Sequence, residues 1–106
     1  MFEDEDKIYI IKNLSDRNLT GKGVAFELKA EFDEYINFMR EWYGNNSPSF
    51  NCFVKNAEKL IKKIEPSESI TISSDYEIEN IFIDVLDSLE FRSKRYDSFE
   101  ISVIYQ

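Results

Sequence analysis

KIYIIK, at residues 7–12, has apolar side chains on both faces of an extended chain. Ile8 and Ile10 point to one face, and Tyr9 and Ile11 point to the other, because side chains alternate along a strand. A strand that is apolar on both faces is typical of the middle of a sheet, where other elements cover it. The sequence therefore predicts a central strand at residues 7–12, and the remaining elements are expected to pack around it.

Three further stretches alternate in the manner of strands, at residues 24–30, 69–74 and 99–106. The first of them, VAFELKA, puts its apolar side chains on one face and Glu27 and Lys29 on the other. We expect a half-buried strand there, although the end of this stretch could instead belong to the following helix. The other two, SITISS and FEISVIYQ, are expected to complete a sheet of about four strands, and FRSKRYDS, at residues 91–98, is expected to be the turn before the last of them.

Three segments have the spacing of amphipathic helices. The first, at residues 31–43, gathers its apolar side chains within an arc of about 120°, namely Phe32, Tyr35, Ile36, Met39, Trp42 and Tyr43. The second is expected to begin at a Ser47 cap with Pro48 in its first position, and Pro66 follows its end. The third is expected to begin at Asp75, and its inward face would be Ile78, Ile81, Phe82, Val85, Leu86 and Leu89.

The predicted order of elements is ββααβαβ, with three helices and about four strands. A sheet that carries its helices on one side, in the α+β class, is the simplest arrangement that buries these faces. A helix on each side of the sheet is the alternative. The 106 residues suffice for a single domain, residues 1–106, in which the acidic residues 1–6 are expected to form a frayed tail.

Composition excludes several classes of function. The chain has no histidine, which removes the commonest general acid and base and every metal site built on histidine. It has no glycine-rich phosphate-binding motif, so we expect neither a catalytic site, nor a cofactor, nor a metal. The formal net charge is −8, which repels nucleic acid and anionic membranes and attracts basic surfaces. An acidic N-terminus and a single cysteine lead us to expect a cytoplasmic protein.

One enzymatic alternative depends on Glu27, Lys29 and the upstream Asp16. An E-x-K pair in a strand puts a carboxylate and an ammonium on one face, which resembles the core of the PD-(D/E)xK nucleases. The resemblance implies a small metal-dependent nuclease in which the acidic residues hold Mg²⁺ and the lysine steadies the attacked phosphate. The sequence departs from that pattern because no Pro-Asp precedes the motif, and the chain is acidic where a nuclease needs a basic surface.

Two large apolar residues fall outside the inward faces of their helices. Phe38 lies about 60° outside the apolar arc of the first helix, and Ile83 stands nearly opposite the inward face of the third. Carboxylates surround both, so each resembles a binding anchor with an acidic rim, although isolated surface apolar residues are also common. The candidate partner-binding residues are Glu31, Glu34, Phe38, Glu41, Trp42, Tyr76, Glu79, Ile83, Asp87 and Glu90.

EFDEYINFMREWY, at residues 31–43, and DYEIENIFIDVLDSLE, at residues 75–90, combine aromatic residues with carboxylates. In this overall character the chain is similar to the small acidic immunity proteins of bacterial contact-dependent or colicin-like toxin systems. The resemblance implies a cytosolic inhibitor that binds a basic toxin domain, often a nuclease, over or beside its active site. A second binding hypothesis is an acidic mimic of nucleic acid that inhibits a DNA-binding protein, for which two rows of carboxylates and few aromatic anchors would be expected.

Overall fold

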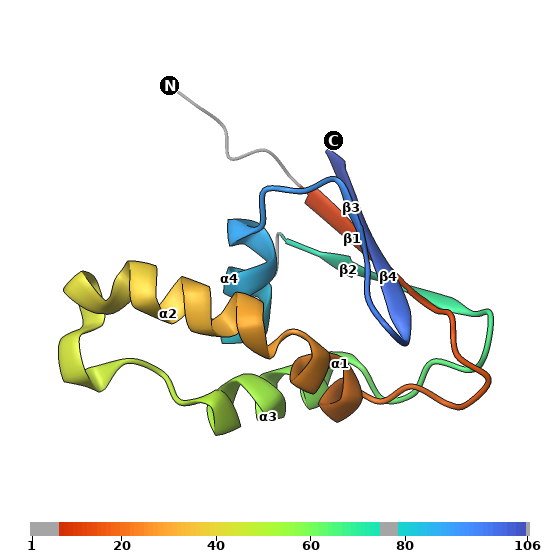
Figure 1. Cartoon of the computed structure of the whole chain (residues 1–106), viewed down its shortest axis with the longest axis horizontal. Coiled ribbons are helices and arrows are strands. Elements are labelled where there is room, and N and C mark those ends of the chain that lie inside the picture. Colours follow the sequence, from red (N-terminus) through yellow and green to blue (C-terminus); the bar gives the residue numbers. More distant parts are fainter. Residues whose placement is uncertain (1–6, 75–78, 106) are drawn as a thin grey trace.

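The central strand is confirmed in the computed structural model, which describes residues 7–74 and 79–105 (Figure 1). Strand β1 lies between β2 and β4 in an antiparallel sheet of order β2-β1-β4-β3. The strands are β1 (Lys7–Asn13), β2 (Ser69–Ser73), β3 (Ser93–Arg95) and β4 (Phe99–Tyr105). The described helices are α1 (Gly21–Glu27), α2 (Lys29–Tyr43), the 3-10 helix η1 (Gly44–Asn46), α3 (Phe50–Leu60) and α4 (Ile81–Ser88).

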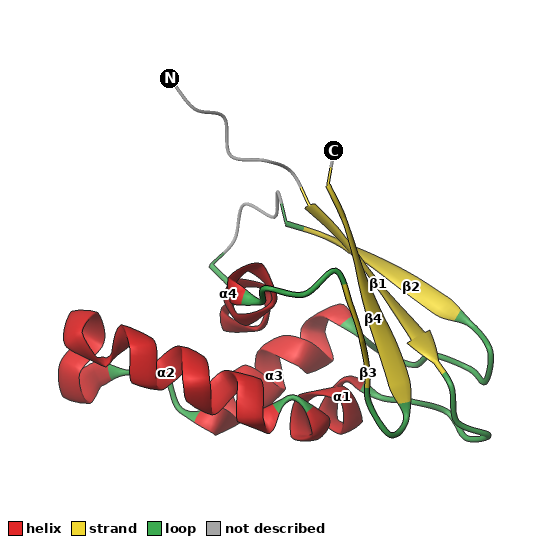
Figure 2. Cartoon of the chain, turned by 45° about the horizontal axis from the view of Figure 1, so that its top comes forward, coloured by secondary structure: helices red, strands yellow, loops and turns green. Residues whose placement is uncertain are grey.

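The helices lie on one side of the sheet, as Figure 2 shows. The sheet residues that face them are buried, namely Tyr9, Ile11, Ile72, Phe99, Ile101 and Val103. On the opposite face Ile8 and Ile10 are only half-buried. The predicted α+β class is therefore confirmed, with its helices on one side of the sheet.

Residues 24–27 belong to α1, Leu28 is a turn residue and residues 29–30 begin α2, so the strand predicted there is wrong, and the alternative that its end belongs to the next helix is confirmed. Helix α1 begins after Thr20, whose side-chain oxygen accepts a hydrogen bond from the Gly23 amide at 3.1 Å. Its buried side chains, Val24 and Ala25, are followed by the buried Leu28, which is the spacing of one helix face. Alternation of three apolar residues was also compatible with a strand, and the N-terminal cap favours the helix.

Helix α1 packs closely against α3. A Cβ atom placed on Gly21 would come within 2.6 Å of the backbone oxygen of Ala57, so only glycine fits at this crossing. Helix α3 begins after Ser49, which accepts from the Cys52 amide at 3.2 Å. The start predicted at Ser47 and Pro48 is therefore two residues too early.

Helix α4 also begins later than the sequence indicates. Its N-cap is Asn80, whose side-chain oxygen accepts from the amides of Phe82 and Ile83 at 2.9 and 3.3 Å. The predicted cap Asp75 and the predicted inward Ile78 lie outside the described residues. The helix lies between α2 and the sheet (Figure 1) and also contacts α3, so it is covered on several sides.

Ile83 is a core residue with only 5% of its surface exposed, so its predicted outward position is wrong. The amphipathic pattern assumed one covered face, whereas α4 buries five of its eight residues, namely Ile81, Phe82, Ile83, Val85 and Leu86.

The β3 edge of the sheet comes from a segment predicted to be a turn. This strand is only three residues long, and its residues are exposed, with Lys94 and Arg95 among them. Short strands and basic side chains are features that discourage further pairing at a sheet edge.

Among residues 7–74 and 79–105, no helix combines the length and the apolar character that crossing a bilayer requires.

Candidate docking surface

The outward face of α2 carries two large aromatic side chains. Phe38 is 76% exposed and Trp42 is 78% exposed. They are four residues apart, so they lie next to each other on one face of the helix. The exposure predicted for Phe38 is confirmed, but the inward position predicted for Trp42 is wrong. The C-terminal half of α2 extends beyond the sheet (Figure 1), so the inner face of this half has less of the core to cover.

Two exposed carboxylates lie beside Phe38 on the same helix. Glu34 precedes Phe38 by four residues and Glu41 follows it by three, which places both on neighbouring positions of the helix surface. No residue of the described part of the chain forms an ion pair with either side chain. We define the docking surface as Glu34, Phe38, Glu41 and Trp42. It is apolar at its centre and carries two negative charges that no ion pair among residues 7–74 and 79–105 compensates.

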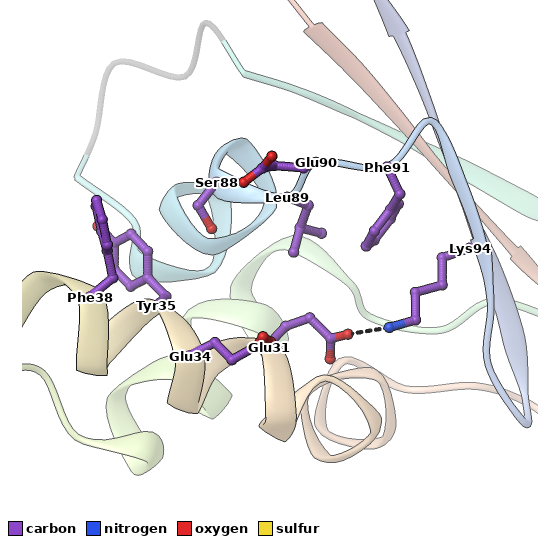
Figure 3. A pocket seen from close by; sticks show the side chains of 9 residues that line it. All are labelled: Glu31, Glu34, Tyr35, Phe38, Ser88, Leu89, Glu90, Phe91 and Lys94. Atoms are coloured by element: carbon purple, nitrogen blue, oxygen red, sulfur yellow. Dashed lines mark hydrogen bonds and ion pairs between the residues drawn. The ribbon is translucent and has the colours of Figure 1, made fainter.

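A cavity of about 620 Å³ adjoins this surface (Figure 3). It lies between α2 and the segment that runs from the end of α4 to β3, and both sides supply apolar walls and a carboxylate. Its lining residues are Glu31, Glu34, Tyr35, Phe38, Ser88, Leu89, Glu90, Phe91 and Lys94. Four residues predicted from the sequence to bind a partner, Glu31, Glu34, Phe38 and Glu90, therefore meet around one cavity.

Glu31 forms an ion pair inside the protein. Its carboxylate accepts from the Lys94 ammonium at 2.7 Å, and only 9% of the Glu31 side chain is exposed. The Lys94 nitrogen also lies 5.6 Å from the ring centre of Phe91 and 5.2 Å from that of Tyr96. Burial and then the nearby Glu31 charge raise the pKa of the Tyr96 hydroxyl above its usual value. Glu31 thus anchors β3 to α2, in addition to lining the cavity.

The partner-binding residues predicted on the third helix do not form a second exposed apolar surface with an acidic rim. Asp87 accepts a hydrogen bond from the Tyr9 hydroxyl, and the Lys7 ammonium donates to the Asp87 backbone oxygen at 3.2 Å. Burial, followed by this bond to Asp87, raises the pKa of Tyr9. Glu79 is exposed, while Tyr76 lies outside the described residues. Because Ile83 is buried, the interpretation that two helices repeat one anchor design is wrong.

The sequence did not predict that the segment after α4 forms one wall of the cavity. Leu89 was expected to face inward along a longer helix, and residues 91–98 were expected to be a turn. Both Leu89 and Phe91 are half-buried against the core and line the cavity. An aromatic residue at the start of an otherwise polar turn was the available signal, since such a residue usually packs against something.

The described residues do not show the strand arrangement on which the nuclease alternative depends. Glu27 ends α1 and accepts from the Ser98 amide at 3.1 Å, while Lys29 begins α2 and pairs with Asp33 at 2.9 Å. They share no strand, so the strand geometry that supported the resemblance is contradicted. Within the described residues, no three histidine, cysteine or acidic side chains gather where they could hold a metal ion.

Comparison with known proteins finds no matching family model, no similar curated protein and no similar solved structure, so the geometry of α2 and its cavity is the evidence from which a function can be argued.

Proposed function

We propose that this chain binds a basic protein through the docking surface on α2. The proposed role is that of an immunity protein, which neutralises a basic toxin, such as a nuclease, by covering its active site or an adjacent surface. The observation that carries the proposal is the exposure of Phe38 and Trp42, 76% and 78%, beside two carboxylates that form no ion pair with any residue of the described ranges. Large aromatic residues at the centre of an interface supply much of the binding free energy, and tryptophan is among those most enriched there.

The charge of the chain supports a basic partner. With 21 acidic and 13 basic residues, the chain has a formal charge of −8 and attracts positively charged macromolecules over several ångströms. Glu34 and Glu41 concentrate part of that charge beside the aromatic pair. In such a surface the carboxylates mainly accelerate association, and the desolvated aromatic residues slow dissociation.

The proposal is tested by producing the chain together with the protein encoded beside its gene. We expect a stable complex with a partner that has a basic domain, and we expect the toxic activity of that partner to fall when the chain is added. A neighbouring protein that is acidic, or whose activity does not respond to the chain, would contradict the immunity role.

The docking surface itself is tested by Phe38→Ala and Trp42→Ala in that complex. Each substitution is expected to weaken binding by about 1–3 kcal/mol, or roughly five-fold to 150-fold in the dissociation constant. Tyr105→Ala is the matched control, because Tyr105 is an aromatic residue that is 43% exposed on β4. Equal affinities for the wild type and both α2 variants would refute this surface.

The role of charge is tested with a matched pair of double variants. Glu34→Gln with Glu41→Gln is expected to slow association and to reduce its dependence on salt, because both charges lie at the interface. Glu58→Gln with Asp97→Asn removes the same net charge from other exposed positions and is expected to have a smaller effect. Equal effects of the two double variants would show that net charge alone, and not the docking surface, determines the association rate.

A further inference from the structure

We infer that the cavity beside the docking surface receives an arginine side chain of the basic partner. This inference rests on the proposed function and specifies the chemistry of its contact. The cavity lies between α2 and the segment from Ser88 to Lys94, and it adjoins the docking surface through the shared residues Glu34 and Phe38.

The cavity combines apolar walls with an excess of negative charge among its lining residues. Figure 3 shows Tyr35 and Phe38 on the α2 side of the cavity, and Leu89 and Phe91 on the side formed by the segment after α4. Of its four charged residues, Glu31 and Lys94 neutralise each other in an ion pair.

The other two charged residues, Glu34 and Glu90, are exposed and have no ion-pair partner within the described ranges. They come from opposite sides of the cavity. The complementary group is therefore a side chain with an apolar stem and a cationic end.

The Lys94 side chain shows that this part of the protein already accommodates a cation. Its ammonium lies 2.7 Å from the Glu31 carboxylate and within 6 Å of the ring centres of Phe91 and Tyr96. A carboxylate together with aromatic faces is the environment that stabilises a partly desolvated cation. The same kinds of group, a carboxylate and an aromatic ring, are provided on the α2 side by Glu34 and Phe38.

Arginine fits this arrangement better than lysine. Its guanidinium group is planar, stacks on aromatic rings and carries five donors, so it can bridge carboxylates on two walls at once. The lysine ammonium is a compact and strongly hydrated charge that gains less from stacking. Glu34 on α2 and Glu90 just beyond α4 place one exposed carboxylate on each side of the cavity, where either can attract a guanidinium that enters it.

The test uses three small probes and the complete ¹⁵N-labelled chain. N-acetyl-arginine methylamide, its lysine counterpart and its uncharged citrulline counterpart are titrated while amide chemical shifts are followed. We expect the arginine probe to shift amides of residues 31–38 and 88–94 and to bind at least about three-fold more tightly than the lysine probe. The citrulline probe has nearly the same shape and is expected to produce no saturable shift there.

Two variants with opposite charge changes sharpen the test. Glu34→Gln with Glu90→Gln is expected to weaken the arginine probe by roughly three-fold to ten-fold, as is typical when exposed charge-assisted contacts are lost. Lys94→Met removes the competing cation and frees the Glu31 carboxylate, so it is expected to strengthen the probe by roughly three-fold. The spectrum of each variant without probe reports whether the fold is retained.

Equal binding of the arginine and citrulline probes would overturn the inference, and so would shifts confined to amides elsewhere. If the probe leaves the cavity unperturbed while Phe38→Ala still weakens partner binding as expected, the cavity assignment fails and the proposed function stands. If the arginine probe binds as expected but the neighbouring protein does not, the cationic site stands and the proposed function fails.

Discussion

The sequence predicts both Ile83 and Phe38 on the outer surfaces of their helices, whereas the structure buries Ile83 and exposes Phe38. Comparing the stabilities of Ile83→Ala and Phe38→Ala tests this difference. Ile83 is 5% exposed within α4, and Phe38 is 76% exposed on α2. Truncating isoleucine removes three carbons, worth about 2.4 kcal/mol at about 0.8 kcal/mol each. The cavity that remains brings the expected loss in the free energy of unfolding to about 3–4 kcal/mol. Truncating Phe38 removes few contacts, so we expect a loss below about 0.5 kcal/mol.

Urea unfolding followed by circular dichroism is a suitable assay, because it reports the helices. Fluorescence is less suitable, because the single tryptophan, Trp42, is exposed in the folded protein. If the stability falls by about 2 kcal/mol per molar urea, the midpoint should drop by about 1.5–2 M for Ile83→Ala and by less than about 0.3 M for Phe38→Ala. An unchanged midpoint for Ile83→Ala would refute its burial. A large drop for Phe38→Ala would show that this ring is covered in solution, and the docking surface would lose its anchor.

Two further predictions concern the stability of the fold. Gly21→Ala should lower the free energy of unfolding by about 1–3 kcal/mol because its Cβ would meet the Ala57 carbonyl, whereas Gly23→Ala, with no atom nearer than 3.5 Å, should be neutral or stabilising. Thermal unfolding of both variants checks this, and equal effects would contradict the close packing at Gly21. The fold raises the pKa of Tyr9 and Tyr96, so their contribution to stability is complete below the unfolded pKa of about 10 and is lost as the pH rises above it. Unfolding measured between about pH 9 and pH 11 should therefore show falling stability that Tyr9→Phe makes less steep, and a flat profile in the wild type would contradict this.

The strands could be predicted from the sequence where apolar alternation and burial coincide. Residues 7–12 and 99–106 meet this condition, and β1 and β4 occupy nearly those positions. The short β3 could not be predicted in this way, because its residues are exposed and polar. Its pairing with β4 is set by the tertiary structure, in which Lys94 of β3 also forms an ion pair with Glu31 of α2.

The helices show where local patterns stop being informative. An amphipathic pattern indicates which face of a helix is apolar, but it does not indicate how many neighbours the helix has or how far they extend. Ile83 is buried because α4 is covered on several sides, and Trp42 is exposed because the end of α2 extends beyond the sheet. The candidate site was therefore predicted in part. Phe38 and the carboxylates of α2 were identified from the sequence, while the wall formed by Leu89 and Phe91 could be identified only from the fold.

The C-terminal half of α2, which extends beyond the sheet, contains positions that can change during evolution without affecting the core. Phe38, Glu41 and Trp42 support little of the interior, so replacing them should cost the protein little stability. Under the proposed function, mutation could therefore exchange one recognised toxin for another at these positions while the sheet and the inner helices stay unchanged. Variants selected for a new cognate partner should accumulate their substitutions on this projecting part of α2 and leave Gly21 and Ile83 as they are.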